Sequence, residues 1–319
     1  MPREDYRVNG GNLLGQTEKY SFKCLGNESA IDFRVLIKPY DTKSEGDGVL
    51  PYFAVARNIW ALDLSNHLFS IVENISGKMD GFIRAKIVKD ESKILSLEIP
   101  DGERGRVLVG IDTGQDQGVT LPQKQWEAWI GEHPKAQITL DASFFPASGV
   151  EVRPTVWATE YKIGDLILHD VPLKESSSIE DRVSPGTQCI LGLFAVARLS
   201  IVLDAERDIA YLTPSKSPPP RYEHNRLGAV FVPRDNGSDD LFAVVAKAGP
   251  ADVAGVRNGD ILIRIDKLDV SKWRSVSGIL PLSRFWAMPA GSKHILVVRR
   301  GTKTIKIKVI LMDILVPSL

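Results

Sequence analysis

The residues best suited to do chemistry are Asp112, Thr113 and Gly114, which follow an apolar run at residues 107–111. The run is β-branched at alternate positions, which is typical of a buried strand that ends in a tight turn. Because an unpaired buried charge is costly, the carboxylate either caps this turn through its own backbone or acts on a ligand. In the second case Asp112 would be one of two carboxylates that share a proton and activate a water. Thr113 would lock the turn, and Gly114 would let backbone and substrate approach closely.

Other catalytic motifs are missing from the sequence. The five histidines are scattered, and neither H-E-x-x-H nor G-x-S-x-G occurs, so zinc and serine-hydrolase chemistry have no support. Cys24 and Cys189 lie far apart without a metal-type partner, which predicts buried free thiols. We therefore expect no metal and no cofactor.

The composition excludes several classes of partner. The 319 residues allow two or three domains, and 40 basic residues balance 40 acidic ones, which disfavours nucleic acid as a partner. No apolar run reaches membrane-spanning length, so no membrane span is expected. The first residues are polar and lack a secretory signal. The chain is expected to be cytoplasmic, or periplasmic or secreted if its native start lies further upstream.

An internal repeat organises the first two thirds of the chain. Residues 190–198 match residues 49–57 at a spacing of 141, and both copies contain Phe-Ala-Val-Ala-Arg. Residues 162–173 resemble residues 23–37 at slightly smaller spacings. Two copies of one strand-rich lobe explain this pattern. In the first copy the acid turn would fall before Met1, so we expect that lobe to be incomplete.

The second copy has a recognisable order of elements. Strands are predicted at residues 82–88 and 94–99, and a short helix at residues 121–130. Trp126 and Trp129 share one face of that helix, which indicates core packing. A hairpin at residues 143–157 either covers a cleft or lies on the surface, and the pattern favours neither.

The pattern changes after a stretch at residues 216–221 with three consecutive prolines, which predicts a stiff linker. Beyond it, residues 227–231 and 241–246 are short strand candidates, and residues 249–262 form a helical turn followed by a glycine turn into a strand. Residues 294–312 form a hairpin in which lysines alternate with apolar residues. That alternation is the solvated face of a strand and no nucleic-acid site.

Residues 20–213 resemble the retropepsin-like aspartic peptidases in their bacterial two-lobed form. The resemblance rests on Asp112-Thr113-Gly114, on Ile190-Leu191-Gly192 and on the ending at residues 200–212. It implies an aspartic endopeptidase in which Asp112, Thr113 and Gly114 form the catalytic turn, and Ile190, Leu191 and Gly192 pack behind it. Two features depart from the family pattern: Gln115 replaces a small residue, and Pro51 stands where the second copy has Gly192.

Residues 226–312 resemble a PDZ domain of bacterial type. The resemblance rests on residues 249–262 and on the strand Leu227, Gly228, Ala229, Val230 and Phe231. It implies that this strand pairs with an extended peptide and holds its terminal carboxylate.

These observations predict a mainly β protein with acid-protease-like lobes and a partly open PDZ barrel. Residues 1–79 would form a partial first lobe, 80–214 the second lobe, 215–225 the linker and 226–319 the PDZ domain. The expected function is aspartic endopeptidase action on a peptide or protein substrate, with protein C-termini bound by the PDZ domain. The second aspartate would come from an upstream segment, or less favourably from a homodimer. The alternative is a binding protein in which the peptidase fold is only a scaffold.

Overall fold

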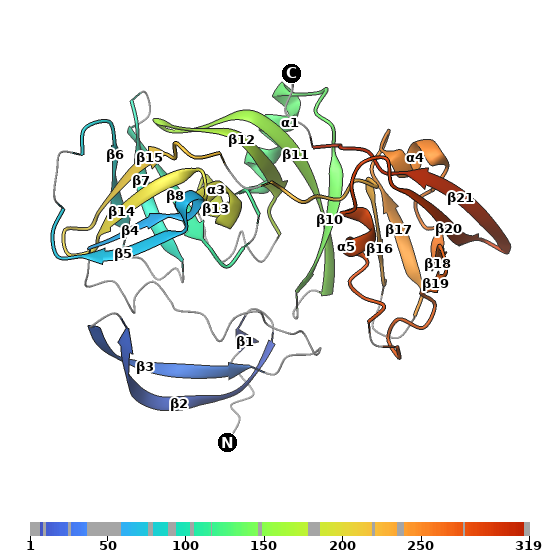
Figure 1. Cartoon of the computed structure of the whole chain (residues 1–319), viewed down its shortest axis with the longest axis horizontal. Coiled ribbons are helices and arrows are strands. Elements are labelled where there is room, and N and C mark those ends of the chain that lie inside the picture. Colours follow the sequence, from blue (N-terminus) through green and yellow to red (C-terminus); the bar gives the residue numbers. More distant parts are fainter. Residues whose placement is uncertain are drawn as a thin grey trace.

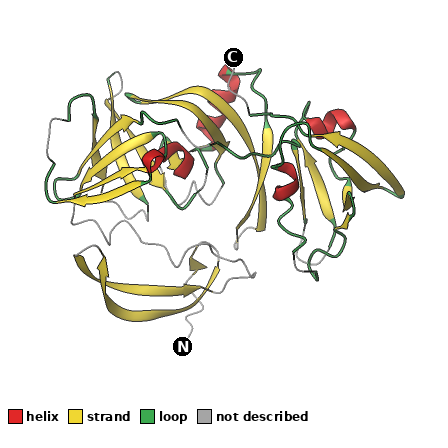
Figure 2. Ribbon diagram, viewed as in Figure 1, coloured by secondary structure: helices red, strands yellow, loops and turns green. Residues whose placement is uncertain are grey.

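The computed structural model describes residues 7–8, 11–24, 27–36, 59–75, 79–88, 94–102, 105–115, 117–145, 149–177, 186–218, 221–234, 239–276 and 278–315. The protein is mainly β, with a large mixed sheet and a C-terminal antiparallel sheet (Figure 2). The general fold class expected from the sequence is therefore confirmed.

A small N-terminal sheet stands apart from the large one in Figure 1. It consists of β1 (Arg7–Val8), β2 (Gly11–Cys24) and β3 (Asn27–Leu36), and β2 and β3 pair antiparallel with Cys24 opposite Asn27. Pro51 and the first copy of Phe-Ala-Val-Ala-Arg lie outside the described residues.

The large sheet has 12 strands in the order β10-β11-β12-β9-β13-β8-β7-β6-β15-β14-β4-β5. Their bounds are β4 (Ile59–Asp63), β5 (Leu68–Val72), β6 (Ile83–Val88), β7 (Leu95–Asp101), β8 (Gly105–Asp112), β9 (Val119–Leu121), β10 (Thr139–Phe145), β11 (Gly149–Ile163), β12 (Leu166–Glu175), β13 (Cys189–Gly192), β14 (Leu199–Asp204) and β15 (Ile209–Pro214). Two pairings are parallel, β12 with β9 and β13 with β8. The alternating apolar residues of these strands build one continuous core that includes the fully buried Leu97, Val109 and Leu173.

The longest helix among the described residues, which packs beside the large sheet, begins later than predicted. α1 runs over Gln123–Glu132 because residues 119–121 join the sheet as β9, and the helix continues through Gly131. Trp126 is buried in the core as expected, and the Trp129 ring stacks on His133 with centroids 4.0 Å apart. The shorter helices are η2 (Leu64–Asn66) and α3 (Leu193–Val196). Cys189 is a buried free thiol, and burial raises its pKa.

The two repeat copies form the same turn between paired strands. In the first copy the Asn66 N–H donates to Asp63 Oδ1 at 3.2 Å, and in the second the Arg207 N–H donates to Asp204 Oδ1 at 3.1 Å. The residue that follows is left-handed in both, with φ of 54° at His67 and 55° at Asp208. These positions are 141 residues apart, which is the spacing of the repeat.

The copies meet at the pairing of β4 with β14. Ala61 lies opposite Val202, its own counterpart in the other copy, and Ile59 and Asp63 lie opposite Asp204 and Ser200. The pairs are therefore related by a local two-fold axis through the Ala61–Val202 pair. Ser200 Oγ also donates to Asp63 Oδ2 at 3.1 Å across this pairing.

The C-terminal sheet follows residues 221–228. Its strands are β16 (Ala229–Val232), β17 (Leu241–Val245), β18 (Ile261–Ile265), β19 (Leu268–Asp269), β20 (Lys293–Arg300) and β21 (Lys303–Ile310), and its helices are α4 (Pro250–Ala254) and α5 (Ser283–Trp286). The main path is β16-β17-β18-β20-β21, with β19 paired to β18. A second core, which includes Leu227, Ala251 and Leu296, lies within this part of the chain.

The large and C-terminal sheets touch where β10 lies beside β16 (Figure 1). Leu140 packs with Val230 and Ala246 in a separate apolar cluster, with Val152, Val232 and Val244 at its margin. The connecting segment is also anchored, since the Ser215 N–H donates to Arg198 O at 2.7 Å and the Tyr222 ring lies 4.7 Å from Phe194. No helix among the described residues is long and apolar enough to cross a membrane.

The left-handed turn at His67 makes a first prediction. A β-branched residue at this φ is strained, so His67→Val should lower the free energy of unfolding by about 1–2 kcal/mol. His67→Gly should cause no loss, because glycine adopts this conformation freely. Urea unfolding followed by far-UV circular dichroism measures both variants, and equal stability of the two would contradict the assigned turn.

Candidate functional site

The Asp112 turn lies at the end of β8, against β13. The parallel register places Ile190 beside Gly110, Leu191 beside Ile111 and Gly192 beside Asp112. The partly buried Asp112 caps its own turn: its Oδ1 accepts from the Gly114 N–H at 3.0 Å, and its carbonyl accepts from the Gln115 N–H at 3.1 Å. Thr113 and Gly114 are exposed.

The residues after this turn bind the loop that follows β13. The Leu193 N–H donates to Gln115 O at 2.7 Å, and the Gly192 N–H donates to Gly118 O at 2.8 Å. An added Cβ at Gly192 would lie 2.4 Å from Gln117 O, so the backbones approach too closely for any side chain there. Gln115 also accepts from Thr120 Oγ1 at 3.3 Å. Gln115, which departs from the expected small residue, is thus part of the packing of the turn.

Asp112 has no acidic partner in the part of the chain that the structure describes. No hydrogen bond or ion pair joins its carboxylate to a second one there. The proton-sharing chemistry requires two carboxylates in contact, since one group cannot act as both base and acid on the same substrate. The geometry therefore supports the capping role of Asp112.

A second polar group lies on β10 and β12. Lys174 is only 5% exposed, and its Nζ donates to Asp141 Oδ2 at 2.8 Å and to Ser143 Oγ at 3.3 Å. Gln117 Nε2 reaches the same Asp141 oxygen at 3.5 Å. An ammonium that donates to both groups has no lone pair to take the Ser143 proton, so this arrangement holds the hydroxyl without activating it. The buried Lys174 of β12 thus forms an ion pair with the half-exposed Asp141 of β10.

The loop before β16 is held tightly on both sides. Gly228 has φ of 69°, and an added Cβ would lie 3.3 Å from Gly249 Cα and from Pro250 Cδ. The Ala251 N–H donates to Leu227 O at 2.9 Å, and the Ala246 N–H donates to Gly228 O at 2.8 Å. Glycine is required here because the backbone is left-handed and touches the start of α4.

β16 pairs with β17 on one side only, so the backbone groups on its other side do not bond to β17. Gly228 O bonds to Ala246, and the register continues with Ala229 opposite Val245 and Phe231 opposite Ala243. Antiparallel pairs alternate between bonded and non-bonded, so the N–H and C=O groups of Ala229 and Phe231 point away from β17. β16 is an end strand of its sheet, so these groups form the outer edge.

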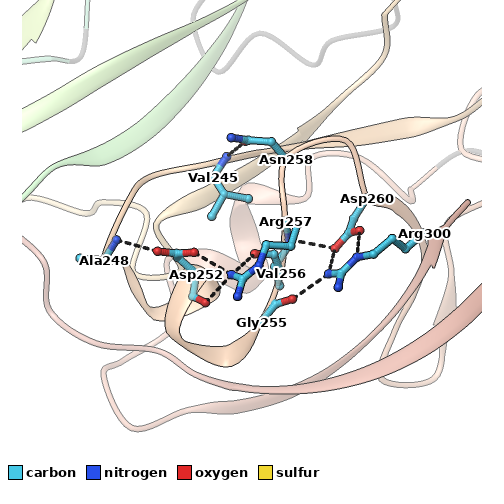
Figure 3. A network of polar contacts seen from close by, with 9 residues as sticks. All are labelled: Val245, Ala248, Asp252, Gly255, Val256, Arg257, Asn258, Asp260 and Arg300. Atoms are coloured by element: carbon cyan, nitrogen blue, oxygen red, sulfur yellow. Dashed lines mark hydrogen bonds and ion pairs between the residues drawn. The ribbon is translucent and has the colours of Figure 1, made fainter.

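A polar network fixes α4 and the turn after it (Figure 3). Arg257 Nη1 donates to Asp252 Oδ1 at 2.7 Å, and the Arg257 N–H donates to Asp260 Oδ2 at 2.9 Å. Arg300 donates to both oxygens of Asp260, at 2.7 and 2.8 Å, and to Gly255 O at 2.7 Å. Burial tends to raise the pKa of Asp260, but the hydrogen bonds and charges of Arg300 and Arg257 outweigh it and hold that pKa below its usual value.

Comparison with known proteins yields only distant structural similarity. No family model matches the chain, and no curated protein matches it. Among solved structures, a variant of the HtrA-type protease AlgW with a tripeptide is 11% identical over 80% of this chain and 93% of that chain, with a TM-score of 0.25. The serine endoprotease from Yersinia pestis is 11% identical over 83% of this chain and 98% of that chain, with a TM-score of 0.21.

These findings correct the family assignment made from the sequence. The similar structures are HtrA-type proteases, so the assignment to the retropepsin-like aspartic peptidases is wrong, and with it the aspartic endopeptidase function. The physical reason is that Asp112 caps its own turn without a second acid in the described structure. At these TM-scores the similarity gives no argument for a serine mechanism.

Sequence reasoning also missed one residue that the structure brings to the β16 edge. Asn225 falls at the end of the predicted linker, yet its Nδ2 donates to Ala229 O at 2.8 Å and to Leu140 O at 2.9 Å. No local pattern could have indicated this, because Leu140 lies 85 residues away in the chain. Among the described residues no group of three or more potential ligands could hold a metal ion.

The close approach at Gly192 can be tested by stability. Gly192→Ala should lower the free energy of unfolding by about 1–3 kcal/mol, because the new Cβ overlaps the Gln117 carbonyl. Gly131→Ala in α1 is the matched control: an added Cβ there meets nothing within 4 Å. It should raise stability by about 0.5–1 kcal/mol. Urea unfolding measures the stability of both variants. A Gly192→Ala chain as stable as the parent would refute the close packing of Gly192 against Gln117.

The Asp260 network predicts a dependence of stability on pH. Since the folded-state pKa of Asp260 lies below the unfolded one, its contribution is present above about pH 4 and is lost as pH falls through the folded pKa. Asp260→Asn should lower the unfolding free energy by about 1–3 kcal/mol at pH 7. The difference from the parent should shrink at acidic pH.

Urea unfolding of the parent, Asp260→Asn and Arg300→Gln chains between pH 7 and 3 measures this dependence. Arg300→Gln removes the same pair from the other side and should show a similar loss. A difference that stays constant down to pH 3 would speak against the ion pair.

Proposed function

We propose that residues 226–315 form a PDZ-like module that binds the C-terminal end of an extended peptide. The observation that carries the proposal is the outer edge of β16, where the backbone groups of Ala229 and Phe231 point away from β17. An extended peptide satisfies such an edge by pairing as an added strand, which is a recurrent mode of peptide recognition.

The loop before the edge supplies the second part of the proposal. Gly228 is left-handed, and successive N–H groups around such a residue form a concave anion site. A peptide that pairs with β16 would bring its terminal carboxylate to this loop. Leu227, Gly228, Ala229, Val230 and Phe231 are therefore the proposed binding residues, with the loop holding the carboxylate and the strand holding the peptide backbone.

The neighbourhood of the edge supports a fixed geometry. The Phe231 ring lies 5.9 Å from the ring of Trp286 in α5, and the Arg226 N–H donates to Trp286 O at 2.9 Å. The Arg226 side chain is 2% exposed and donates to Asp313 and to Ala287 O. This buried and hydrogen-bonded arginine limits the movement of the loop, so less ordering is needed on binding.

The test is selection of decapeptides with free C-termini on the full chain, followed by calorimetry with the best sequence. Amidating its C-terminus should weaken binding roughly tenfold to a hundredfold, because a charge-assisted contact is lost. Ala229→Pro should weaken binding by about tenfold or more. It removes an outward N–H and leaves the bonds to β17 intact.

Ile167→Ser is the control, since this side chain is exposed on β12 and lies outside the proposed site. It should bind within about threefold of the parent. Circular dichroism establishes that both variants are folded. Binding that is insensitive to amidation and to Ala229→Pro would refute the proposed site.

A further inference from the structure

Both the oxygen and the nitrogen of the Asn225 side-chain amide make hydrogen bonds at the β16 edge. Its Oδ1 accepts from the Leu227 N–H at 2.9 Å, and its Nδ2 donates to Ala229 O at 2.8 Å and to Leu140 O at 2.9 Å. The orientation of the amide is fixed, because the backbone N–H can only donate and the two carbonyls can only accept.

Two of these bonds occupy the proposed peptide site. Ala229 O is one of the outward groups of β16, and the Leu227 N–H belongs to the loop that would hold a carboxylate. A bound peptide end would present the same chemistry: an oxygen acceptor for the loop, and an N–H donor for the strand. Asn225 thus stands where the last residue of a ligand would stand.

The third bond connects this position to the large sheet. Leu140 belongs to β10, and the neighbouring Thr139 Oγ1 donates to the Asn225 carbonyl at 2.6 Å. Thr139 is 2% exposed, and Leu140 packs with Val230 and Ala246 on the opposite sheet. The residue that fills the edge is therefore also a residue that fastens the two sheets together.

From this double role we infer that Asn225 is an internal ligand of the peptide-binding edge, held in place by β10. The inference rests on the proposed peptide-binding function and adds its regulation. A peptide that reaches Ala229 O and the Leu227 N–H must displace the Asn225 amide, which also breaks its bond to Leu140. Peptide binding and docking of β10 oppose each other, and this coupling acts equally in both directions.

The coupling predicts that loosening either contact tightens peptide binding. Asn225→Ala removes the internal ligand and should increase affinity by about fivefold to fiftyfold, since two or three neutral hydrogen bonds no longer compete. Val152→Asp places a charge on β11, at the margin of the β10 contact, and should also increase affinity. Because both changes release the same contact, the double variant should bind little better than the tighter single variant.

The probe is the decapeptide with a free C-terminus that is selected on the full Asn225→Ala chain. Its dissociation constant is measured by calorimetry on the parent, both single variants, the double variant and Ile167→Ser. Ile167 is exposed on β12, away from this contact, so that control should bind like the parent. Hydrogen exchange adds a second readout: saturating peptide should speed exchange of β10 amides in the parent and leave it unchanged in Asn225→Ala.

The outcomes separate the two proposals. If no carboxylate-dependent decapeptide binds any chain, the peptide-binding function fails and the internal ligand fails with it. If the peptide binds but parent and Asn225→Ala have equal affinity, the binding function stands and the internal ligand is refuted. Tighter binding by Asn225→Ala with fully additive effects of Val152→Asp would refute the coupling to β10.

Discussion

The outer backbone edge of β16 is the constraint on which the proposed function depends. Backbone N–H and C=O groups need partners, and an end strand offers a row of them to whatever lies nearby. Here the first partner belongs to the same chain, because Asn225 bonds to Ala229 O and to the Leu227 N–H. The left-handed Gly228 and the anchored Arg226 fix the loop that leads into this edge.

Asp112 illustrates why a short motif does not define an activity. The turn at Asp112-Thr113-Gly114 forms at the end of a buried strand, and Gly192 lies beside it. Its carboxylate accepts a hydrogen bond from the Gly114 N–H of the same turn. Catalysis of the expected type requires two carboxylates in contact. Local sequence describes the turn well, but the presence of a second group depends on chain segments far away.

Much of the local structure could be predicted, and most long-range contacts could not. Alternation of apolar residues located β6 and β7, since a strand with one buried face has a period of two, and the apolar run at residues 107–111 located β8. The helix was predicted to start at residue 121, two residues too early, because Leu121 pairs with β12 as the last residue of β9. Asn225 and Lys174 carried no signal at all: their partners Leu140 and Asp141 lie 85 and 33 residues away, and only the folded sheet brings them together.

The axis between β4 and β14 has a consequence for how such a chain can evolve. In a homodimer, every substitution at a two-fold interface appears twice, once in each subunit. Here the two halves of the pairing are encoded separately, so Asp63 can bond to Ser200 while its counterpart Asp204 lies opposite the apolar Ile59. Because one chain carries both copies, a substitution in one leaves the other unchanged, and the two halves can differ at positions where a symmetric assembly must be identical.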